Sequence, residues 1–344
     1  MSDEPHVIVE RRGRLGHLRL HRPRALNALD HGMVLAMITA LREWADDPDV
    51  HTVVITGDGD RGLCAGGDIV TLYRDAIGGD GAASERFWAD EYRLNVMIAR
   101  YPKPYVAVMD GIVLGGGVGV SAHGSHRVVT ERSRVGLPEV GIGFVPDIGA
   151  TYLLSRAPGE TGTHVALTGD PVAAGDAIAL GLADELVPSD RIPSLLAALE
   201  SQSADEALAS HAQPAPPSAL LAARAWIDDA YARPEVADIV AALRASAAPE
   251  AQAAADTIAT RSPTALAATL ESLRRARELP DLERVIAQEF RVSLAGLRAP
   301  DFAEGVRAQV IDKDRNPQWQ PAGSVTRAEV AAWFAPLGNR ELQL

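Results

Sequence analysis

The sequence predicts an α/β fold over residues 1–203 and a helical region over residues 221–344. In the first part, short runs rich in β-branched residues alternate with helical stretches, which is typical of α/β architectures. Several of these pieces have the pattern of short ββα units, unlike the longer βαβ units of a doubly wound sheet. In the last part the strand runs disappear and amphipathic helical patterns replace them.

The N-terminal elements follow from local patterns. Residues 6–23 alternate apolar and polar side chains around Gly13, which predicts a hairpin of two strands. Residues 29–47 offer Asp30 as a helix N-cap and carry apolar residues at helical spacing. Further strands are expected over 51–57, 103–111, 125–131 and 134–141, with helical stretches around 115–124 and 150–157.

The C-terminal part begins after a segment of unusual composition. Residues 204–220 are rich in Ala, Ser and Pro, which favours a connection between two regions. We therefore expect a core over 1–203, a connection over 204–220 and a helical region over 221–344. Amphipathic helices are predicted at 220–232, 236–247, 263–278 and 281–297.

Composition excludes several classes of protein. A net charge of −13 without a basic run disfavours nucleic-acid partners. No window approaches about 18 consecutive apolar residues, and the start lacks a basic patch before an apolar run. Neither a membrane span nor a secretory signal is therefore expected. The single cysteine excludes an internal disulfide framework and favours a reducing, cytoplasmic setting.

Two glycine clusters offer backbone N–H groups to a ligand. In the stretch 63–69, two glycines precede Asp68, which could equally cap the next helix after a tight turn. The triplet Gly115–Gly117 follows an apolar strand and precedes a helical stretch, although close strand–helix packing would also explain it. One N–H from each cluster could form an oxyanion hole.

Motifs for dinucleotide binding, a serine nucleophile or a metal site are weak or absent in this sequence. The run GDGDRG at 57–62 matches a dinucleotide fingerprint, but Asp58 and Asp60 stand where phosphate would lie. No G-x-S-x-G elbow is present, and no His/Cys/Asp set, His123 and His126 included, has metal-ligand spacing. Cys64 is expected to be a small buried residue. We expect no metal site.

Three acids are candidates for catalysis. Glu139 follows a proline in an apolar, glycine-rich segment, where a carboxylate without a role is unusual. Asp147 follows another proline in the same segment, and it could instead be the N-cap of the next helix. Glu91 lies on an expected helix, where a solvated face is the simpler interpretation.

Together these segments resemble the crotonase, or enoyl-CoA hydratase/isomerase, superfamily. The resemblance is carried by HRPRALNAL, LCAGGDI, DGIVLGGGVGVS and LPEVGIGFVPDIGATYLLSR. It implies a spiral of ββα units and a CoA thioester whose carbonyl oxygen is held by the N–H groups of Gly67 and Gly116. Typical hydratases carry a glutamate three residues after that second glycine, where this chain has Gly119, and another at the position of Glu139. The resemblance therefore puts ordinary hydration in doubt.

Within the superfamily, the chain is most similar to the branch of 3-hydroxyisobutyryl-CoA hydrolases. DEYRLN resembles its acidic helix, and residues 302–321 resemble its C-terminal ending. The resemblance spans nearly the whole chain, is weakest over 200–260, and implies hydrolysis of a short branched β-hydroxyacyl-CoA, as in valine degradation. It makes Glu91, Gly116, Glu139 and Asp147 substrate-binding positions, with Glu139 and Asp147 catalytic.

The resemblance needs no metal or redox cofactor, because CoA is part of the substrate. Arg22 and Arg24 are candidates for its phosphates. Hydratase or isomerase activity remains an alternative, and a non-catalytic acyl-CoA-binding protein is a lesser one. Members of the superfamily often form trimers or hexamers, so the resemblance implies a possible homo-oligomer.

Overall fold

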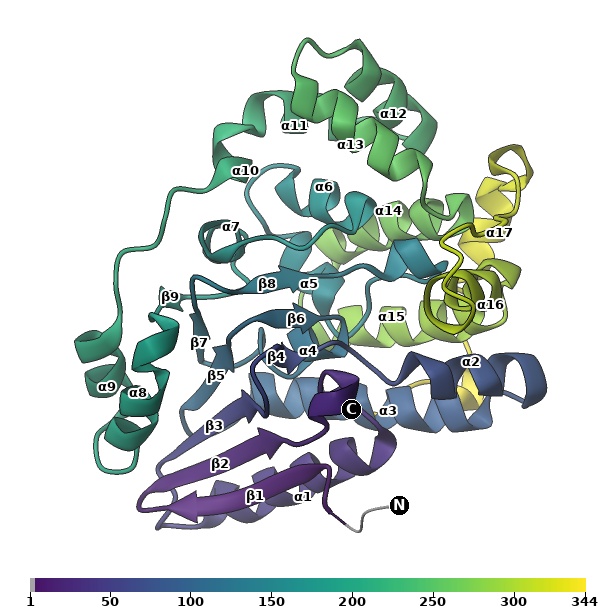
Figure 1. The fold of residues 1–344 in the computed structure, drawn as a ribbon. Coiled ribbons are helices and arrows are strands. Elements are labelled where there is room, and N and C mark those ends of the chain that lie inside the picture. The colour runs from purple at the N-terminus through teal and green to yellow at the C-terminus, as the bar shows by residue number, and fades with distance from the viewer. Residues whose placement is uncertain (1–3) are drawn as a thin grey trace. The chain divides into compact units, whose positions relative to one another are not determined.

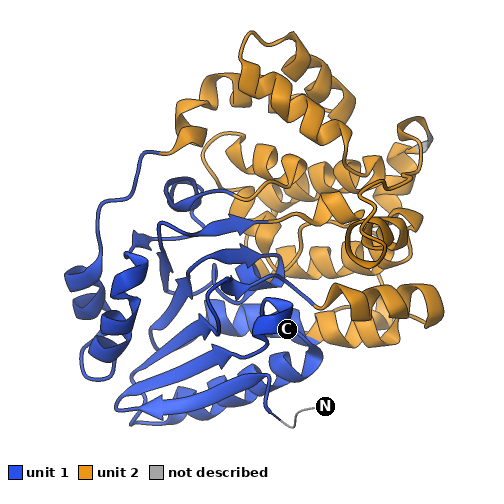
Figure 2. Cartoon of the chain, in the orientation of Figure 1, with its two compact units in different colours: residues 1–67, 90–136, 172–217 blue, residues 68–89, 137–171, 218–344 orange. Residues whose placement is uncertain are grey.

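The computed structural model describes residues 4–344, and the first three residues, part of the start assessed for a secretory signal, lie outside it. The chain forms two compact units built from alternating segments (Figure 2). Unit 1 takes the chain up to residue 67 together with 90–136 and 172–217, and unit 2 takes 68–89, 137–171 and 218–344. The predicted boundaries at residues 203 and 220 stay a prediction.

Unit 1 contains two sheets (Figure 1). The larger has the order β1-β2-β3-β5-β7-β9, and the smaller has the order β4-β6-β8. Apart from the antiparallel hairpin β1–β2, all neighbouring strands are parallel. The strands are β1 (Val7–Arg12), β2 (Leu15–Leu20), β3 (Thr52–Gly57), β4 (Gly62–Cys64), β5 (Tyr105–Met109), β6 (Ile112–Leu114), β7 (His126–Val129), β8 (Arg134–Gly136) and β9 (Glu185–Leu186).

Each turn of the chain adds one strand to each sheet. β3 joins the larger sheet and β4 the smaller one, and the pairs β5–β6 and β7–β8 repeat this step. A helical segment follows each pair before the next turn begins. The predicted α/β fold of short ββα units is therefore confirmed.

Helices cover the larger sheet of unit 1. The first, α1 (His31–Asp46), begins at the predicted cap, because the Asp30 side chain accepts a hydrogen bond from Met33 N at 2.8 Å. Gly16 of β2 leaves room for the Trp44 ring of α1. α8 (Ile192–Leu199) and α9 (Ala204–His211) share a core with the strands that includes Leu15, Val54, Val106, Leu195 and Leu208.

Unit 2 is helical, and its last segment confirms the helical character predicted for the C-terminal part. Its core joins Val140 and Leu167 to the apolar faces of α11 to α14. Its helices include α2 (Ile69–Gly78), α5 (Ala150–Leu154), α6 (Thr161–Thr168), α10 (Ala219–Ala222), α11 (Arg224–Tyr231), α12 (Val236–Ala245), α13 (Pro249–Ala259), α14 (Pro263–Glu278), α15 (Leu282–Leu297), α16 (Pro300–Val306) and α17 (Arg327–Ala332). The helix α3 (Ala82–Ala99) begins in unit 2 and ends in unit 1.

Some elements differ from expectation. The helix α9 lies inside the segment 204–220, because Ser203 and Glu206 form a capping box that begins it. The helical stretch expected around 115–124 shortens to α4 (Gly116–Gly119), followed by turns. The last α/β segment adds α7 (Ala174–Ala179). No helix among residues 4–344 combines the length and the apolar character needed to cross a membrane.

The segment that carries Glu139 offers a test of this packing. Gly143 ends the 3-10 helix η2 (Glu139–Ile142) with φ +71°, and a β-carbon there would lie 2.1 Å from Asp301 O. We expect Gly143→Ala to lower the free energy of unfolding by more than about 2 kcal/mol, through left-handed strain and overpacking. Gly141→Ala is the matched control, since its β-carbon would meet only the flexible Arg261 side chain, at 3.3 Å. Equal urea midpoints for the two variants would contradict this packing.

Candidate active site

The two glycine turns of unit 1 lie side by side. β4 and β6 are parallel neighbours, so the loops that follow them leave the same edge of the smaller sheet. A β-carbon built on Gly116, at the start of α4, would lie 3.3 Å from Gly67 N. Unit 1 therefore brings together both predicted oxyanion donors.

The local backbone holds these turns. Leu29 N donates to Gly66 O at 2.8 Å on one side, and Gly115 N donates to Gly136 O at 3.1 Å on the other. Gly115 adopts φ +48°, which a side chain would disfavour. Gly116 then stands in the first turn of α4, where an N–H has no preceding intrahelical carbonyl. The arrangement suits stabilisation of a developing oxyanion.

Glu91 lies against the same glycine. The β-carbon position of Gly116 is 2.6 Å from Glu91 Oε1, so only glycine leaves room for this carboxylate. Glu91 is 2% exposed, and Tyr92 and Asn95 of the same helix are also fully buried. The interpretation of Glu91 as part of a solvated face is therefore wrong, because α3 runs through the interior at this point.

Cys64 also packs against the glycine triplet. Its side chain is fully buried, and its carbonyl oxygen would lie 2.6 Å from a β-carbon on Gly117. Burial raises the pKa of the Cys64 thiol to about 12, and the charge of Glu91 acts in the same direction. The prediction of a small buried residue is confirmed, and the thiol is unsuited to nucleophilic chemistry.

Glu139 is held by the turn of unit 2 that contains it. It opens η2 directly after Pro138 and is 6% exposed. Its carbonyl oxygen accepts from Phe144 N at 3.0 Å, and the next carbonyl, of Val140, accepts from Ser262 N at 3.2 Å. The carboxylate is thus fixed on a short, well-anchored segment rather than on an exposed loop.

Asp147 lies in the same segment but is not a helix cap. α5 begins at Ala150 with Gly149 as its N-cap, so the alternative interpretation of Asp147 is wrong. Its carbonyl oxygen accepts from Ala150 N at 2.8 Å, which forms a tight turn before the helix. Asp147 is 6% exposed, and the next residue, Ile148, has φ +57°. The Asp68 cap, in contrast, is present, because its side chain accepts from Thr71 N.

Glu289 is a buried acid that sequence reasoning missed. It lies in α15, is 1% exposed, and accepts hydrogen bonds from Gly149 N at 2.6 Å, Thr151 N at 2.9 Å and Thr151 Oγ1 at 2.6 Å. Burial, with a smaller contribution from the charge of Asp147, raises its pKa to about 8 against the effect of these hydrogen bonds. The available signal was a carboxylate in the apolar stripe of an amphipathic helix.

The two arginine candidates differ in their surroundings. Arg22 donates to Ala28 O at 2.6 Å and lies 3.7 Å from Asp30, so its guanidinium helps to close the loop after β2. Arg24 is exposed. Their roles toward CoA phosphates stay a prediction. His21 Nδ1 lies 2.5 Å from the carboxylate of Asp58, so this histidine already has a partner within the chain.

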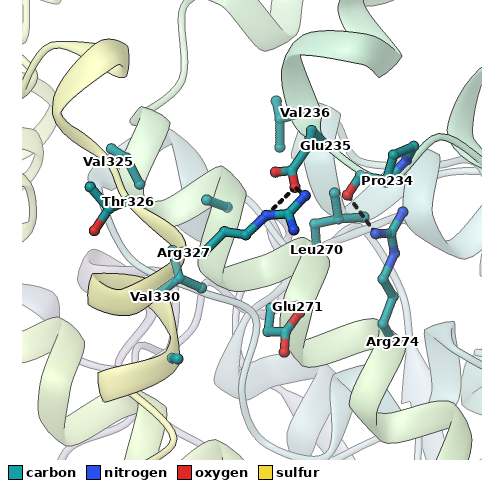
Figure 3. A pocket seen from close by; sticks show the side chains of 12 residues that line it. Pro234, Glu235, Val236, Leu270, Glu271, Arg274, Val325, Thr326, Arg327 and Val330 are labelled. Carbon is teal, nitrogen blue, oxygen red and sulfur yellow. Dashed lines mark hydrogen bonds and ion pairs between the residues drawn. The ribbon is translucent and has the colours of Figure 1, made fainter.

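A pocket of about 450 Å³ in unit 2 contains none of the predicted residues (Figure 3). Arg327 pairs with Glu235 across it, and Arg274 donates to Pro234 O at 2.6 Å. One of these arginines is thus held by a carboxylate and the other by a backbone carbonyl, and nothing in the lining suggests the chemistry of an acyl ester.

Comparisons with known proteins place the chain in a family. The family model of enoyl-CoA hydratase/isomerase matches residues 15–334. The chain belongs to the enoyl-CoA hydratase/isomerase family. It is 37% identical to a Xenopus tropicalis protein named 3-hydroxyisobutyryl-CoA hydrolase, mitochondrial, over 98% of this chain and 90% of that one.

Two solved structures share the crotonase fold over nearly the whole chain. One, named as a carnitinyl-CoA dehydratase from Mycobacterium thermoresistibile, is 54% identical with a TM-score of 0.96, and covers 99% of both chains. The other, named as an enoyl-CoA hydratase from Rhodobacter sphaeroides, is 42% identical with a TM-score of 0.93, covering 98% of this chain and 100% of that one.

This member of the enoyl-CoA hydratase/isomerase family lacks a side chain at one informative position. Gly119 ends α4, is buried, and donates from its backbone N to Gly115 O at 3.2 Å. Typical hydratases, which this chain resembles, carry a glutamate at this position. Here the residue is glycine, so no carboxylate is present. The acids that remain in the predicted set are Glu91, Glu139 and Asp147.

The buried thiol gives a simple test of unit 1. We expect Cys64, the single cysteine, to be silent toward a thiol-reactive dye in the native protein at pH 8, because it is buried and its pKa is about 12. One thiol per chain should react in guanidinium chloride, which serves as the control. Rapid labelling of the native protein would contradict the burial of Cys64.

The raised pKa of Glu289 predicts a dependence of stability on pH. Between about pH 4.5 and 8 the folded protein should hold the Glu289 proton more tightly than the unfolded chain does. The free energy of unfolding contributed by this group should therefore fall as pH rises through that window. Urea unfolding of the wild type and of Glu289→Gln from pH 5 to 8.5 checks this, since the variant should lack this part of the slope. Parallel curves would contradict it.

Proposed function

We propose that this protein hydrolyses the CoA thioester of a short branched β-hydroxy acid, with 3-hydroxyisobutyryl-CoA as the expected substrate. The observation that carries the proposal is the choice of acids. Glu139 and Asp147 are both buried in one segment, while position 119, a glutamate in typical hydratases, is glycine. The name of the Xenopus tropicalis relative supports the same substrate. A place in valine breakdown would follow from that substrate.

The proposed first step uses the two glycine N–H groups. Gly67 and Gly116 hold the thioester oxygen and stabilise the charge that forms on it when the carbonyl carbon becomes tetrahedral. Their close approach in unit 1 supports this role. Losing one donor of this kind typically costs about 3 kcal/mol of transition-state stabilisation.

Glu139 is the proposed catalytic carboxylate. As a general base it would take a proton from water while the water oxygen bonds to the carbonyl carbon, and collapse would then break the C–S bond. As a nucleophile it would itself bond to that carbon and expel the thiolate, leaving a mixed anhydride that water hydrolyses. Both routes give the free hydroxy acid and CoA thiol, with the thiolate taking up a proton.

Asp147 and Glu91 have supporting roles in this proposal. Asp147 binds the 3-hydroxyl group of the substrate, or positions water and supplies the proton to the leaving thiolate. Glu91, packed against Gly116, helps to hold the hydroxyl or sets the charge around Glu139. Arg24, and less directly Arg22, would contact the CoA phosphates.

Dehydration or hydration is the second candidate, favoured by the name of the 54% identical solved structure, a carnitinyl-CoA dehydratase. Reversible addition of water across a C=C bond uses one acid–base group on water and one on the α-carbon. Gly119 removes the side chain that typical hydratases use for part of this work. The hydrolase therefore fits the residues better.

The deciding experiment is a panel of acyl-CoA esters assayed in two ways. We expect rapid thiol release from 3-hydroxyisobutyryl-CoA and a slow reaction with unbranched esters. Enoyl-CoA absorbance at equal enzyme concentration measures the rival reaction, with carnitinyl-CoA and crotonyl-CoA in the panel. Loss of enoyl absorbance, or its appearance from a hydroxyacyl-CoA, without thiol release would overturn the hydrolase proposal.

A variant of Glu139 separates an enzyme from a binding protein. Glu139→Gln should lower kcat by on the order of 10²–10⁴, the usual contribution of a positioned acid–base group, while CoA esters still bind. Glu278→Gln, at an exposed position of unit 2, is the matched control and should behave as wild type. Tight ester binding without turnover in the wild type would instead support a non-catalytic acyl-CoA-binding protein.

The compartment and assembly remain parts of the proposal. We propose a cytoplasmic enzyme because a single cysteine favours a reducing compartment, whereas the Xenopus tropicalis relative is named as mitochondrial. A homo-oligomer is expected from the superfamily and can be checked by light scattering.

A further inference from the structure

We propose that Glu289 is a positioning residue that aims the Asp147 carboxylate by clamping the turn between Asp147 and Thr151. The inference deepens the proposed function and rests on it, because it assumes that Asp147 acts on the substrate. Glu289 itself would not touch the substrate. It lies 138 residues from Thr151 in sequence and reaches the turn only through the packing of α15 on α5.

The Glu289 side chain binds the turn at two residues, Gly149 and Thr151. Oε2 of Glu289 accepts from Gly149 N, and Oε1 accepts from both Thr151 N and Thr151 Oγ1. The two oxygens of one side chain thus fix the N-cap and the second residue of α5. In all three contacts a group of the turn donates to an oxygen of Glu289, so both oxygens accept, which the nitrogen of an amide at this position could not do.

The turn needs such a clamp because its backbone is strained. Ile148 has φ +57°, a left-handed conformation that is a true outlier for a β-branched side chain, and Gly149 follows with φ +79°. Strained residues persist only where their surroundings hold them. Ile148 is itself 1% exposed, so the apolar core holds its side chain while Glu289 holds the next N–H.

The geometry explains the direction of Asp147. If Ile148 relaxed to an ordinary φ, the peptide bond after Asp147 would rotate, and the hydrogen bond from Ala150 N to Asp147 O would break. The carboxylate of Asp147 would then leave its present direction. Burying an acid at position 289 is costly, so its presence favours a specific use over general packing.

A series of variants tests the proposal on full-length protein. Glu289→Gln should lower kcat for 3-hydroxyisobutyryl-CoA by at least tenfold, because an amide N–H₂ would face a backbone donor. Thr151→Val removes only the hydroxyl donor and should show a smaller loss, while Thr151→Ser keeps that donor and should recover most of the activity. Gln288→Leu is the control, since its side chain donates to Ser272 O and not to the turn.

The decisive measurement is a double-mutant cycle with Asp147. Because Glu289 acts through Asp147, Glu289→Gln should cause little further loss in an Asp147→Asn background. The same fold-loss in both backgrounds would overturn the proposal and leave Glu289 a packing residue. A loss of kcat in the control Gln288→Leu as large as in Glu289→Gln would overturn it too.

A readout without turnover keeps this inference separate from the proposed function. Amide hydrogen exchange at Gly149 and Thr151 should be faster in Glu289→Gln and in Thr151→Val than in wild type or Gln288→Leu. Unchanged exchange would overturn the clamp whatever reaction the enzyme catalyses. Absent thiol release by the wild type, with faster exchange in the variants, would instead overturn the hydrolase proposal while supporting the clamp.

Discussion

The site of unit 1 depends on a single steric constraint, the absence of a side chain at Gly116. A β-carbon at this position would lie 2.6 Å from the Glu91 carboxylate, which is too close, and 3.3 Å from Gly67 N, which is tight. The parallel pairing of β4 with β6 creates this crowding, because it brings two successive glycine turns to one sheet edge. Oxyanion donors and a buried acid can therefore lie next to each other without any side chain dedicated to joining them.

The acids of unit 2 are fixed in a different way. Here the chain makes two tight turns within one segment, one after Glu139 and one after Asp147, and helices from the C-terminal region secure both. The carbonyl next to Glu139 binds α14's cap residue Ser262, and the turn after Asp147 is held by Glu289 of α15. The C-terminal helices thus do more than cover apolar surface, since they hold the backbone that presents the two acids.

The sequence predicts much of this because local signals and the site coincide. Glycine turns, the Asp30 cap and the strand runs are short-range patterns, and each appears in the structure. Glu91 was misjudged because its burial depends on long-range packing of α3 that its neighbours in sequence do not reveal. Glu289 was missed for the same reason, since its partners Gly149 and Thr151 are about 140 residues away in the chain.

The position of the strain also explains why two acids eight residues apart can take different roles. Glu139 belongs to a helical turn whose backbone is ordinary up to Gly143, so its direction does not depend on a strained residue being held in place. Asp147 precedes a β-branched residue in a left-handed conformation, so its direction is set by distant groups that prevent relaxation. An acid on unstrained backbone can keep its direction when a distant contact is lost, whereas an acid beside a strained residue is sensitive to such a loss. Sequence change in α15 is therefore a route by which this family could retune Asp147 while leaving Glu139 and the glycine turns untouched.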